Sequence, residues 1–195
     1  MSKNIVTFVT GNKNKLSEFS AILEDVKNFE LTNRKIDLDE IQSLSLEEIV
    51  EHKVRQAYDI VNGPVLVEDT GFFIDQLNGL PGPLIKFFLD KLGNNAPVKL
   101  IRDSKNRGAT AKVCVGFYDG KNLIIVVGEM VGKISDNESF EDGFGFDVCF
   151  IPDGYSKTLT ELDINVKNKI SARKNAIEKF KEEYEKINLR RIIKN

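Results

Sequence analysis

The sequence predicts an α/β protein in which helices flank an elongated, mixed β-sheet. Strand-like runs alternate with helical patterns over residues 4–93, and a long hairpin pattern follows at 110–134. No internal repeat or low-complexity linker divides the chain, and its 41% hydrophobic and 30% charged residues are ordinary for a globular protein. We therefore expect one domain over residues 1–195, with two lobes around a central cleft.

The first elements follow from their hydrophobic spacing. Residues 4–9 form a short apolar run typical of a buried strand, and residues 29–38 alternate loosely as a second strand. Between them, residues 13–26 carry apolar side chains at helical intervals. The positions on this helical face are Leu16, Phe19, Leu23 and Val26.

A capping box at residues 45–48 opens a long helix that ends at the Asn-Gly-Pro sequence of residues 62–64. The apolar residues of this helix are available to the core, namely Ile49, Ala57, Ile60 and Val61. Residues 65–71 then read as a short buried strand that runs into a polar turn.

The second half begins with a turn and a helix at residues 80–93. The hairpin at 110–134 is centred on the turn pair Asp119-Gly120. Residues 142–154 read as a glycine-rich loop leading to a short strand. The final helix is expected to begin near Lys169 and to end by about Ile187, which leaves a loosely ordered tail over 188–195.

Composition excludes several classes of function. A formal net charge of -2 provides no global positive field for nucleic acid or an anionic membrane. The chain shows no signal-peptide pattern and no apolar run near the roughly 20 residues of a membrane helix. Cys114 and Cys149 lie in apolar stretches, so we expect buried thiols in a reducing compartment and a cytoplasmic location. The single histidine, His52, is expected to be exposed, and it cannot supply a histidine metal cluster.

The sequence Thr10-Gly11-Asn12 stands where the first strand meets the first helix, and Lys13 and Lys15 follow at once. Such a turn presents free backbone N–H groups to an anion, and the two ammonium groups would favour a polyphosphate. The alternative is a simple strand-to-helix turn with Asn12 as the cap and solvated lysines. A P-loop is excluded, because its glycine and lysine spacing does not occur.

Two adjacent carboxylates, Glu68 and Asp69, follow three apolar residues. Adjacent residues on a strand point to opposite faces, so only one of them needs to face a given site. A carboxylate there could hold Mg²⁺ or take a proton from water, and Glu40 could supply a second oxygen ligand. The alternative is an acidic surface turn.

The remaining candidates are individually weak signals. Lys53 and Lys86 lie on predicted helices, where lysines are usually solvated. The aromatic pair around a glycine at residues 144–147 could stack on a base, or could pack in the core. Lys167 and Arg173 stand where they could reach a ligand from the start of the last helix.

In this order the motifs closely resemble the inosine triphosphate pyrophosphatase family, which hydrolyses deaminated purine nucleoside triphosphates. The matching stretches span nearly the whole chain, with family-like spacing. They are "VTGNKNKLSEF", "KIDLDEIQ", "GPVLVEDTGFFIDQLNGLPGPLIKFFL", "GFGFDVCFIPDGY" and "KISARKNAI". The resemblance implies the family's elongated α/β fold with a central cleft, a homodimer, and cleavage between the α- and β-phosphates.

The same resemblance implies roles for individual residues. Asp69 would be the base for the attacking water, and Glu40 and Asp69 would bind Mg²⁺, with Mn²⁺ as an alternative. The substrate-binding residues would be Thr10, Gly11, Asn12, Lys13, Asn14, Lys15, Lys53, Thr70, Lys86, Phe144, Gly145, Phe146, Asp147, Lys167, Ser171 and Arg173.

Two departures from the family pattern bear on the base. Ala172 stands where the family usually has histidine, and Phe146 stands where some members have tryptophan. Phosphate and metal chemistry should be unaffected, whereas the preference for one base over another is open. The alternatives to a deaminated-purine pyrophosphatase are a nucleotide-binding regulatory protein and a related pyrophosphatase with another base preference.

Overall fold

The structure is a computed structural model that describes residues 4–136 and 143–194, with side chains up to Leu189. It has seven strands: β1 (Asn4–Val9), β2 (Phe29–Arg34), β3 (Val65–Ile74), β4 (Pro81–Gly82), β5 (Gly108–Tyr118), β6 (Leu123–Ile134) and β7 (Phe150–Pro152). The α-helices are α1 (Lys13–Leu23), α2 (Leu46–Val61), α3 (Ile85–Leu92), α4 (Ala96–Leu100), α5 (Ile164–Ile170) and α6 (Ala172–Lys194). Two short 3-10 turns are η1 (Asp75–Leu77) and η2 (Gly145–Val148).

All strands belong to one mixed sheet. The order is β2-β1-β3-β5-β6-β7, and β4 pairs with β3. β1 runs parallel to β2 and β3, whereas β3–β4 and β6–β7 are antiparallel. The predicted α/β class, with a mixed sheet flanked by helices, is therefore confirmed.

The chain divides into two compact units, which are described separately. Unit 1 comprises Met1–Asp69, Val113–Gly128 and Arg173–Asn195, and unit 2 comprises Thr70–Lys112 and Glu129–Ala172. The single-domain boundary and the central cleft stay predictions.

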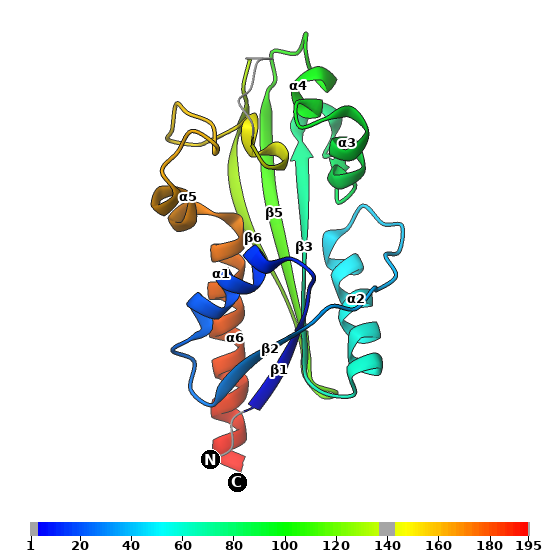
Figure 1. The fold of residues 1–195 in the computed structure, drawn as a ribbon, viewed down its shortest axis with the longest axis vertical. Helices are drawn as coiled ribbons and strands as arrows, with labels where there is room; N and C mark the ends of the chain where they lie inside the picture. The colour runs from blue at the N-terminus through cyan, green and yellow to red at the C-terminus, as the bar shows by residue number, and fades with distance from the viewer. Residues whose placement is uncertain (1–3, 137–142, 195) are drawn as a thin grey trace. The chain divides into compact units, whose positions relative to one another are not determined.

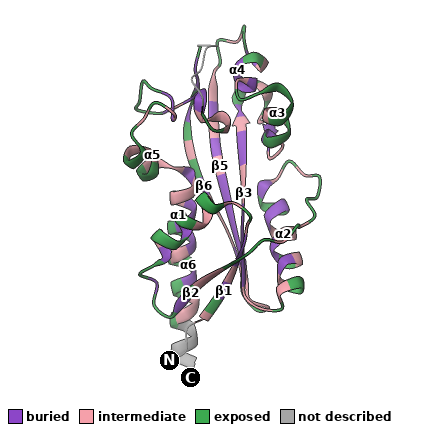
Figure 2. Ribbon diagram, viewed as in Figure 1, coloured by how far each residue is buried: buried purple, intermediate pink, exposed green. Residues whose placement is uncertain are grey.

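In unit 1, helices cover both faces of the sheet. A Cβ placed on Gly116 of β5 would lie 2.6 Å from Val50 of α2, so α2 packs closely on that face. The next residue, Phe117, makes ring contacts with Phe180 and Tyr184 of α6. Because successive strand residues face opposite sides, α2 and α6 lie on opposite faces of β5, as Figure 1 shows. Figure 2 shows the buried residues along β5 between them.

Unit 2 has its own apolar core. Phe72 and Ile74 of β3 are fully buried there and pack with Ile85 of α3, Val98 of α4 and Phe150 of β7. In the part of the chain that the structure describes, no helix is long and apolar enough to cross a membrane.

Several element boundaries differ from the prediction. β3 continues through Ile74, so the turn that we expected at residues 68–71 is wrong. α1 ends at Leu23 and β2 at Arg34, both earlier than the pattern indicated. The short helix α4 was not predicted.

The C-terminal helices also depart from the prediction. The expected start near Lys169 falls inside α5. The helical conformation is interrupted at Ser171, and α6 begins at Ala172. α6 extends to Lys194, past the predicted end near Ile187. Whether the tail at 188–195 is loosely ordered stays a prediction, and Asn195 lies outside the described residues.

Candidate active site

The turn between β1 and α1 is built by its own polar side chains. Asn12 caps α1, and its side-chain oxygen accepts hydrogen bonds from the backbone N–H groups of Asn14 (2.9 Å) and Lys15 (3.3 Å). The Thr10 hydroxyl accepts from the N–H of Asn12 at 3.1 Å. The helix cap that the sequence suggested is thus present. Lys13, in the first turn of α1, is exposed.

Gly11 lies against the side chain of Lys35, which follows β2. A Cβ placed on Gly11 would stand 3.3 Å from Cδ and 3.4 Å from Cε of Lys35. The adjacent strand ends are joined by a hydrogen bond from the N–H of Thr10 to the carbonyl of Arg34 at 3.2 Å. The space beside Gly11 is therefore occupied by a lysine stem, a contact that the sequence did not predict.

Lys15 is part of a buried ion cluster around Glu68 of β3. Its Nζ lies 3.1 Å from Oε1 of Glu68, and Nε of Arg173 lies 2.9 Å from Oε2. Arg173 also bonds Glu18 of α1 through Nη1 at 2.9 Å. The Glu68 side chain is 0% exposed. This cluster joins β3 to α1 and α6.

The charges of this cluster stabilise one another. Burial alone would raise the pKa of Glu68, but Lys15 and Arg173 hold this pKa below its usual value. Burial alone would lower the pKa of Arg173, but Glu68 and Glu18 raise it. Glu68 and Arg173 are therefore ionised at neutral pH.

The second cluster joins Asp69 of β3 to α2. Nζ of Lys53 lies 2.9 Å from Oδ2 of Asp69 and 2.8 Å from Oε1 of Glu40. Lys53 is mostly buried, whereas the Glu40 side chain is 54% exposed. Burial alone would lower the pKa of Lys53, but the carboxylates of Asp69 and Glu40 outweigh it and raise this pKa. The ammonium group therefore remains charged.

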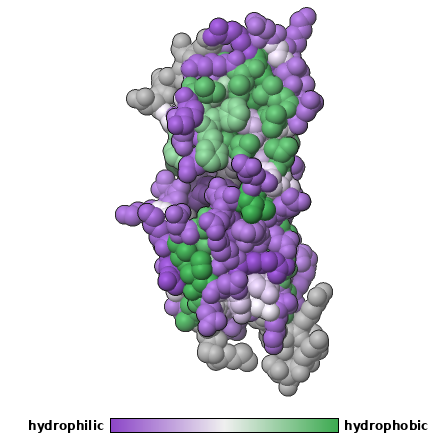
Figure 3. Space-filling model, turned by 90° about the vertical axis from the view of Figure 1, so that its right-hand side faces the viewer, coloured by the Kyte–Doolittle hydropathy of each residue, from purple (hydrophilic) through white to green (hydrophobic). Residues whose placement is uncertain are grey.

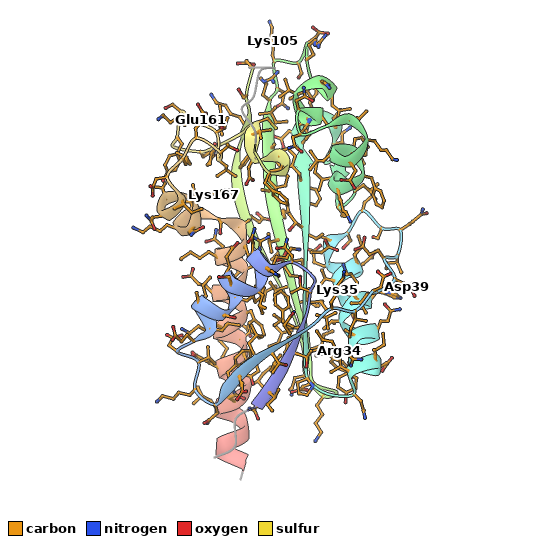
Figure 4. All side chains as sticks on the ribbon, viewed as in Figure 1. Arg34, Lys35, Asp39, Lys105, Glu161 and Lys167 are labelled. Carbon is orange, nitrogen blue, oxygen red and sulfur yellow. The ribbon has the colours of Figure 1, made fainter. Side chains whose placement is uncertain are left out.

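Glu40 is held in place by its neighbour in the loop between β2 and α2. The N–H of Asp39 donates to Oε1 of Gln56, and Nε2 of Gln56 donates to Oδ2 of Asp39, both at 2.8 Å. Gln56 lies on α2, about one turn after Lys53. Figure 4 labels Asp39 on this loop beside α2. The pair of hydrogen bonds anchors the loop next to the carboxylate cluster.

The carboxylates of Glu40 and Asp69 suit a divalent cation. One positive group, the ammonium of Lys53, already lies within 3 Å of both, at 2.8 and 2.9 Å. Among the residues that the structure describes, no group of three His, Cys, Asp or Glu side chains could hold a metal ion. A cation at these two carboxylates would therefore take its other ligands from water and phosphate oxygens, as Mg²⁺ commonly does.

In unit 2, the aromatic motif divides into two environments. The Phe146 ring stacks on Phe72 with centroids 4.4 Å apart and an interplanar angle of 19°. It also meets the edge of Phe150. Phe144 is 81% exposed. Phe146 thus packs with the core of unit 2, whereas the Phe144 ring is available to a ligand.

The other predicted residues of unit 2 have simpler surroundings. Asp147 forms an ion pair with Lys167, which Figure 4 labels. Lys86 is exposed in the first turn of α3. Thr70 is half-buried on β3, directly after Asp69. Gly145 has a left-handed backbone conformation. Ser171 lies between α5 and α6.

The structure thus groups the predicted residues by unit. Unit 1 brings together the turn at 10–15, Glu40, Lys53, Asp69 and Arg173. Unit 2 contains Thr70, Lys86, Lys167 and Ser171, together with the motif at residues 144–147. Ala172, where the family histidine is missing, is buried at the start of α6.

Sequence reasoning missed several residues and misplaced one. Glu68 and Glu18 form ion pairs with the predicted substrate-binding residues Lys15 and Arg173. The sequence feature that could have identified Glu68 is its position next to Asp69 on one strand, where adjacent side chains face opposite sides. The exposure that we expected for His52 is wrong, because it is half-buried. Its Nδ1 has no hydrogen-bond partner among the described residues. Cys114 and Cys149 are buried free thiols, as predicted, and burial raises the pKa of Cys149 to about 12.

Comparison with known proteins places this geometry in a family. The sequence profile of the Ham1 family matches residues 6–183. The chain belongs to the Ham1 family. Curated relatives agree with the resemblance identified from the sequence motifs. An inosine triphosphate pyrophosphatase of Scheffersomyces stipitis is 40% identical over 188 residues, which cover 91% of this chain and 96% of the relative.

A second relative of this Ham1 protein comes from Methanopyrus kandleri. It is a dITP/XTP pyrophosphatase, 40% identical over 182 residues that cover 92% of this chain and 95% of the relative. Solved structures share the fold. A HAM1 protein from Coxiella burnetii has a TM-score of 0.81 at 23% identity, covering 94% of this chain and 99% of that one. A dITP/XTP pyrophosphatase from Mycobacterium abscessus has a TM-score of 0.74 at 24% identity, with coverages of 90% and 97%.

Proposed function

We propose that this Ham1 protein hydrolyses deaminated purine nucleoside triphosphates, namely ITP, dITP and XTP, to the monophosphate and pyrophosphate. The observation that carries the proposal is the Glu40–Lys53–Asp69 cluster. In it the ammonium group of Lys53 lies 2.8 Å from the Glu40 carboxylate and 2.9 Å from the Asp69 carboxylate. The relatives named above as inosine triphosphate and dITP/XTP pyrophosphatases support the substrate class.

The reaction requires a divalent cation, for which Mg²⁺ fits best and Mn²⁺ is the alternative. Glu40 and Asp69 would hold it, because hard oxygen ligands at this number suit Mg²⁺ that keeps water and phosphate ligands. Once bound, the cation would neutralise charge on the phosphates and polarise the reacting phosphoryl group.

Asp69 is the residue that accepts the proton of the attacking water. The water oxygen forms a bond to the α-phosphorus, and its proton passes to the Asp69 carboxylate. The bond from the α-phosphorus to the bridging oxygen breaks, and that oxygen leaves on pyrophosphate with its electron pair. Lys53 donates to Asp69 at 2.9 Å and so holds this carboxylate in one orientation.

Selectivity for the base follows from hydrogen-bond polarity. Hypoxanthine and xanthine carry a carbonyl acceptor at C6, where adenine carries an amino donor. A fixed donor, such as the guanidinium of Arg173 or a backbone N–H, favours the carbonyl, because an unpaired buried donor costs about 1–3 kcal/mol. Phe144, which is largely exposed, is suited to stack on the base.

We propose a homodimer in the cytoplasm. Unit 2 exposes the large apolar side chains Leu80, Phe87 and Leu92, and Figure 3 shows apolar surface over the part of the molecule that carries α3. An exposed apolar area of this kind is typical of a protein interface. The two free, buried thiols suit a reducing compartment. Sedimentation of the purified protein tests the dimer.

The decisive test is turnover of a nucleotide panel by the purified protein with Mg²⁺. We expect pyrophosphate release from ITP, dITP and XTP at rates well above those from ATP and GTP. Release of orthophosphate in place of pyrophosphate would exclude cleavage between the α- and β-phosphates. Binding without turnover would favour a regulatory protein, and preferred cleavage of a standard or pyrimidine nucleotide would indicate a related pyrophosphatase.

A further inference from the structure

The cations of the two clusters are already engaged by carboxylates. Lys15 and Arg173 bind Glu68, and Arg173 also binds Glu18. Lys53 lies between Glu40 and Asp69. The first cluster has no net charge and the second carries one negative charge. A triphosphate therefore needs positive charge from groups outside these two clusters, in addition to a divalent cation.

Two lysines beside the turn between β1 and α1 can supply that charge. Lys13 and Lys35 are both exposed, and neither forms an ion pair within the residues that the structure describes. Lys13 belongs to the turn that the sequence already assigned to the phosphates. Lys35 comes directly after β2 and opens the matching stretch "KIDLDEIQ", but it was not among the predicted substrate-binding residues.

Lys35 is directed to the turn by the sheet itself. β1 and β2 are parallel, and Val9 pairs with Arg34, so Gly11 and Lys35 emerge at the same edge of the sheet. The Asn33 side chain donates to the carbonyls of Phe8 and Thr10, each at 2.9 Å, and fixes the two strand ends to one another. The start of the Lys35 side chain is therefore in a fixed position.

Gly11 then determines the path of the Lys35 side chain. The lysine carbons Cγ, Cδ and Cε all lie 3.3–3.4 Å from the place where a Cβ on Gly11 would stand. Any other residue at position 11 would press on this stem. The Lys35 stem therefore lies against the turn between β1 and α1, which places its ammonium group within one bond of a carbon that touches this turn.

We infer that Lys35 is a further phosphate-binding residue of this enzyme, and that the lack of a side chain at Gly11 lets the Lys35 stem lie close against the turn. The inference rests on the proposed function and adds one cation to the triphosphate site. It also explains why glycine stands at a turn position that is not in the left-handed backbone region, since the glycines with positive φ are found elsewhere.

The first test compares Lys35→Ala with the wild type. We expect KM for ITP to rise about fivefold to tenfold with kcat nearly unchanged, because one charged contact to the phosphates is lost. Lys35→Arg should restore most of the affinity. Raising the salt concentration should weaken binding less in Lys35→Ala than in the wild type. The matched control is Lys121→Ala, an exposed lysine of unit 1 in the β5–β6 turn, which should behave as wild type.

The second test uses inorganic tripolyphosphate with Mg²⁺, measured by titration calorimetry. Its affinity should fall by the same factor in Lys35→Ala, because the probe has no base or sugar. Gly11→Ala should weaken binding in the wild type but add little in the Lys35→Ala background. Equal tripolyphosphate affinity in the wild type and Lys35→Ala would overturn the inference. Because calorimetry needs no turnover, absence of ITP hydrolysis by the wild type would count against the proposed function alone.

Discussion

Glu68 and Asp69 are adjacent on β3, yet their carboxylates bind cations from opposite faces of the sheet. Glu68 is fully buried and accepts from Lys15 and Arg173, whereas Asp69 is partly exposed and accepts from Lys53. The alternation of side chains along a strand produces this division. The arrangement supports the proposed roles, in which Glu68 holds Lys15 and Arg173 in place and Asp69 takes part in the chemistry.

Asp69→Asn should abolish most of the turnover while the protein stays folded. The amide cannot take the proton from water and is a poorer metal ligand, so we expect kcat to fall by about 10²–10⁴-fold. The side chains of Lys53 and Asp69 are only 13% and 24% exposed, so weakening their pair should lower the free energy of unfolding by about 1–3 kcal/mol. Pyrophosphate release and a thermal melt measure both. Residual activity above a tenth of the wild type would remove Asp69 from the mechanism.

Glu68→Gln should show a pH-dependent loss of stability. The lowered pKa of Glu68 means that its stabilisation is fully present above the usual value of 4.5 and is lost as the pH falls through the lowered pKa. At neutral pH the variant leaves Lys15 and Arg173 without their shared carboxylate, which should cost about 3–5 kcal/mol. Below pH 4.5 this difference from the wild type should shrink.

Urea unfolding of both proteins between pH 3 and pH 7 measures that difference directly. A difference that stays constant as the pH falls would show that Glu68 does not stabilise the fold through its charge. Glu161→Gln offers a control, since Glu161 also has a lowered pKa but lies at the surface of unit 2.

The sequence predicted the parts of this site that depend on local pattern. The caps at Asn12 and Ser45 are both present, because each needs only neighbours a few residues away. The full capping box is not formed, because the N–H of Ser45 donates to the hydroxyl of Ser43 and not to the carboxylate of Glu48. Glu40 and Asp69, which the resemblance paired as metal ligands, contact the same ammonium group of Lys53, and their metal binding stays a prediction. The turn expected at residues 68–71 was wrong because two polar residues inside an apolar strand read as its end.

Long-range contacts account for what the sequence left out. The stem of Lys35 packs on Gly11, and Gln56 bonds Asp39, across intervals that no local pattern encodes. Phe146 was offered either as a base-stacking or as a core residue. Its contacts with Phe72 and Phe150, which the sequence could not show, favour the core.

Gln56→Ala should weaken the binding of the divalent cation. It removes both hydrogen bonds to Asp39, so the loop that carries the exposed Glu40 loses its anchor on α2. We expect the Mg²⁺ concentration for half-maximal activity to rise about threefold to tenfold, with kcat at saturating Mg²⁺ nearly unchanged. Arg55→Ala, one residue earlier on α2, removes a surface pair with Glu51 and is the matched control.

A readout independent of activity is Mn²⁺ binding to the free protein, followed by electron paramagnetic resonance. Gln56→Ala should bind Mn²⁺ more weakly than both the wild type and Arg55→Ala. Gln56→Glu should have a larger effect, because it sets a carboxylate against Asp39. An unchanged Mg²⁺ curve for Gln56→Ala would show that Glu40 is positioned without this pair.

Substitutions at the two phenylalanines of the aromatic motif should separate stability from substrate binding. Phe146→Ala removes the ring stacked on Phe72 and should destabilise the protein by about 3 kcal/mol. Phe144→Ala removes an exposed ring, so its stability should change by less than about 0.5 kcal/mol.

If Phe144 stacks on the base, KM for ITP should rise about tenfold in Phe144→Ala, since one stacking contact contributes about 1–3 kcal/mol. Inhibition by tripolyphosphate should not change, because that ligand has no base. A matching rise in the inhibition constant would show that Phe144 acts on the phosphates or on the fold of unit 2 and does not contact the base.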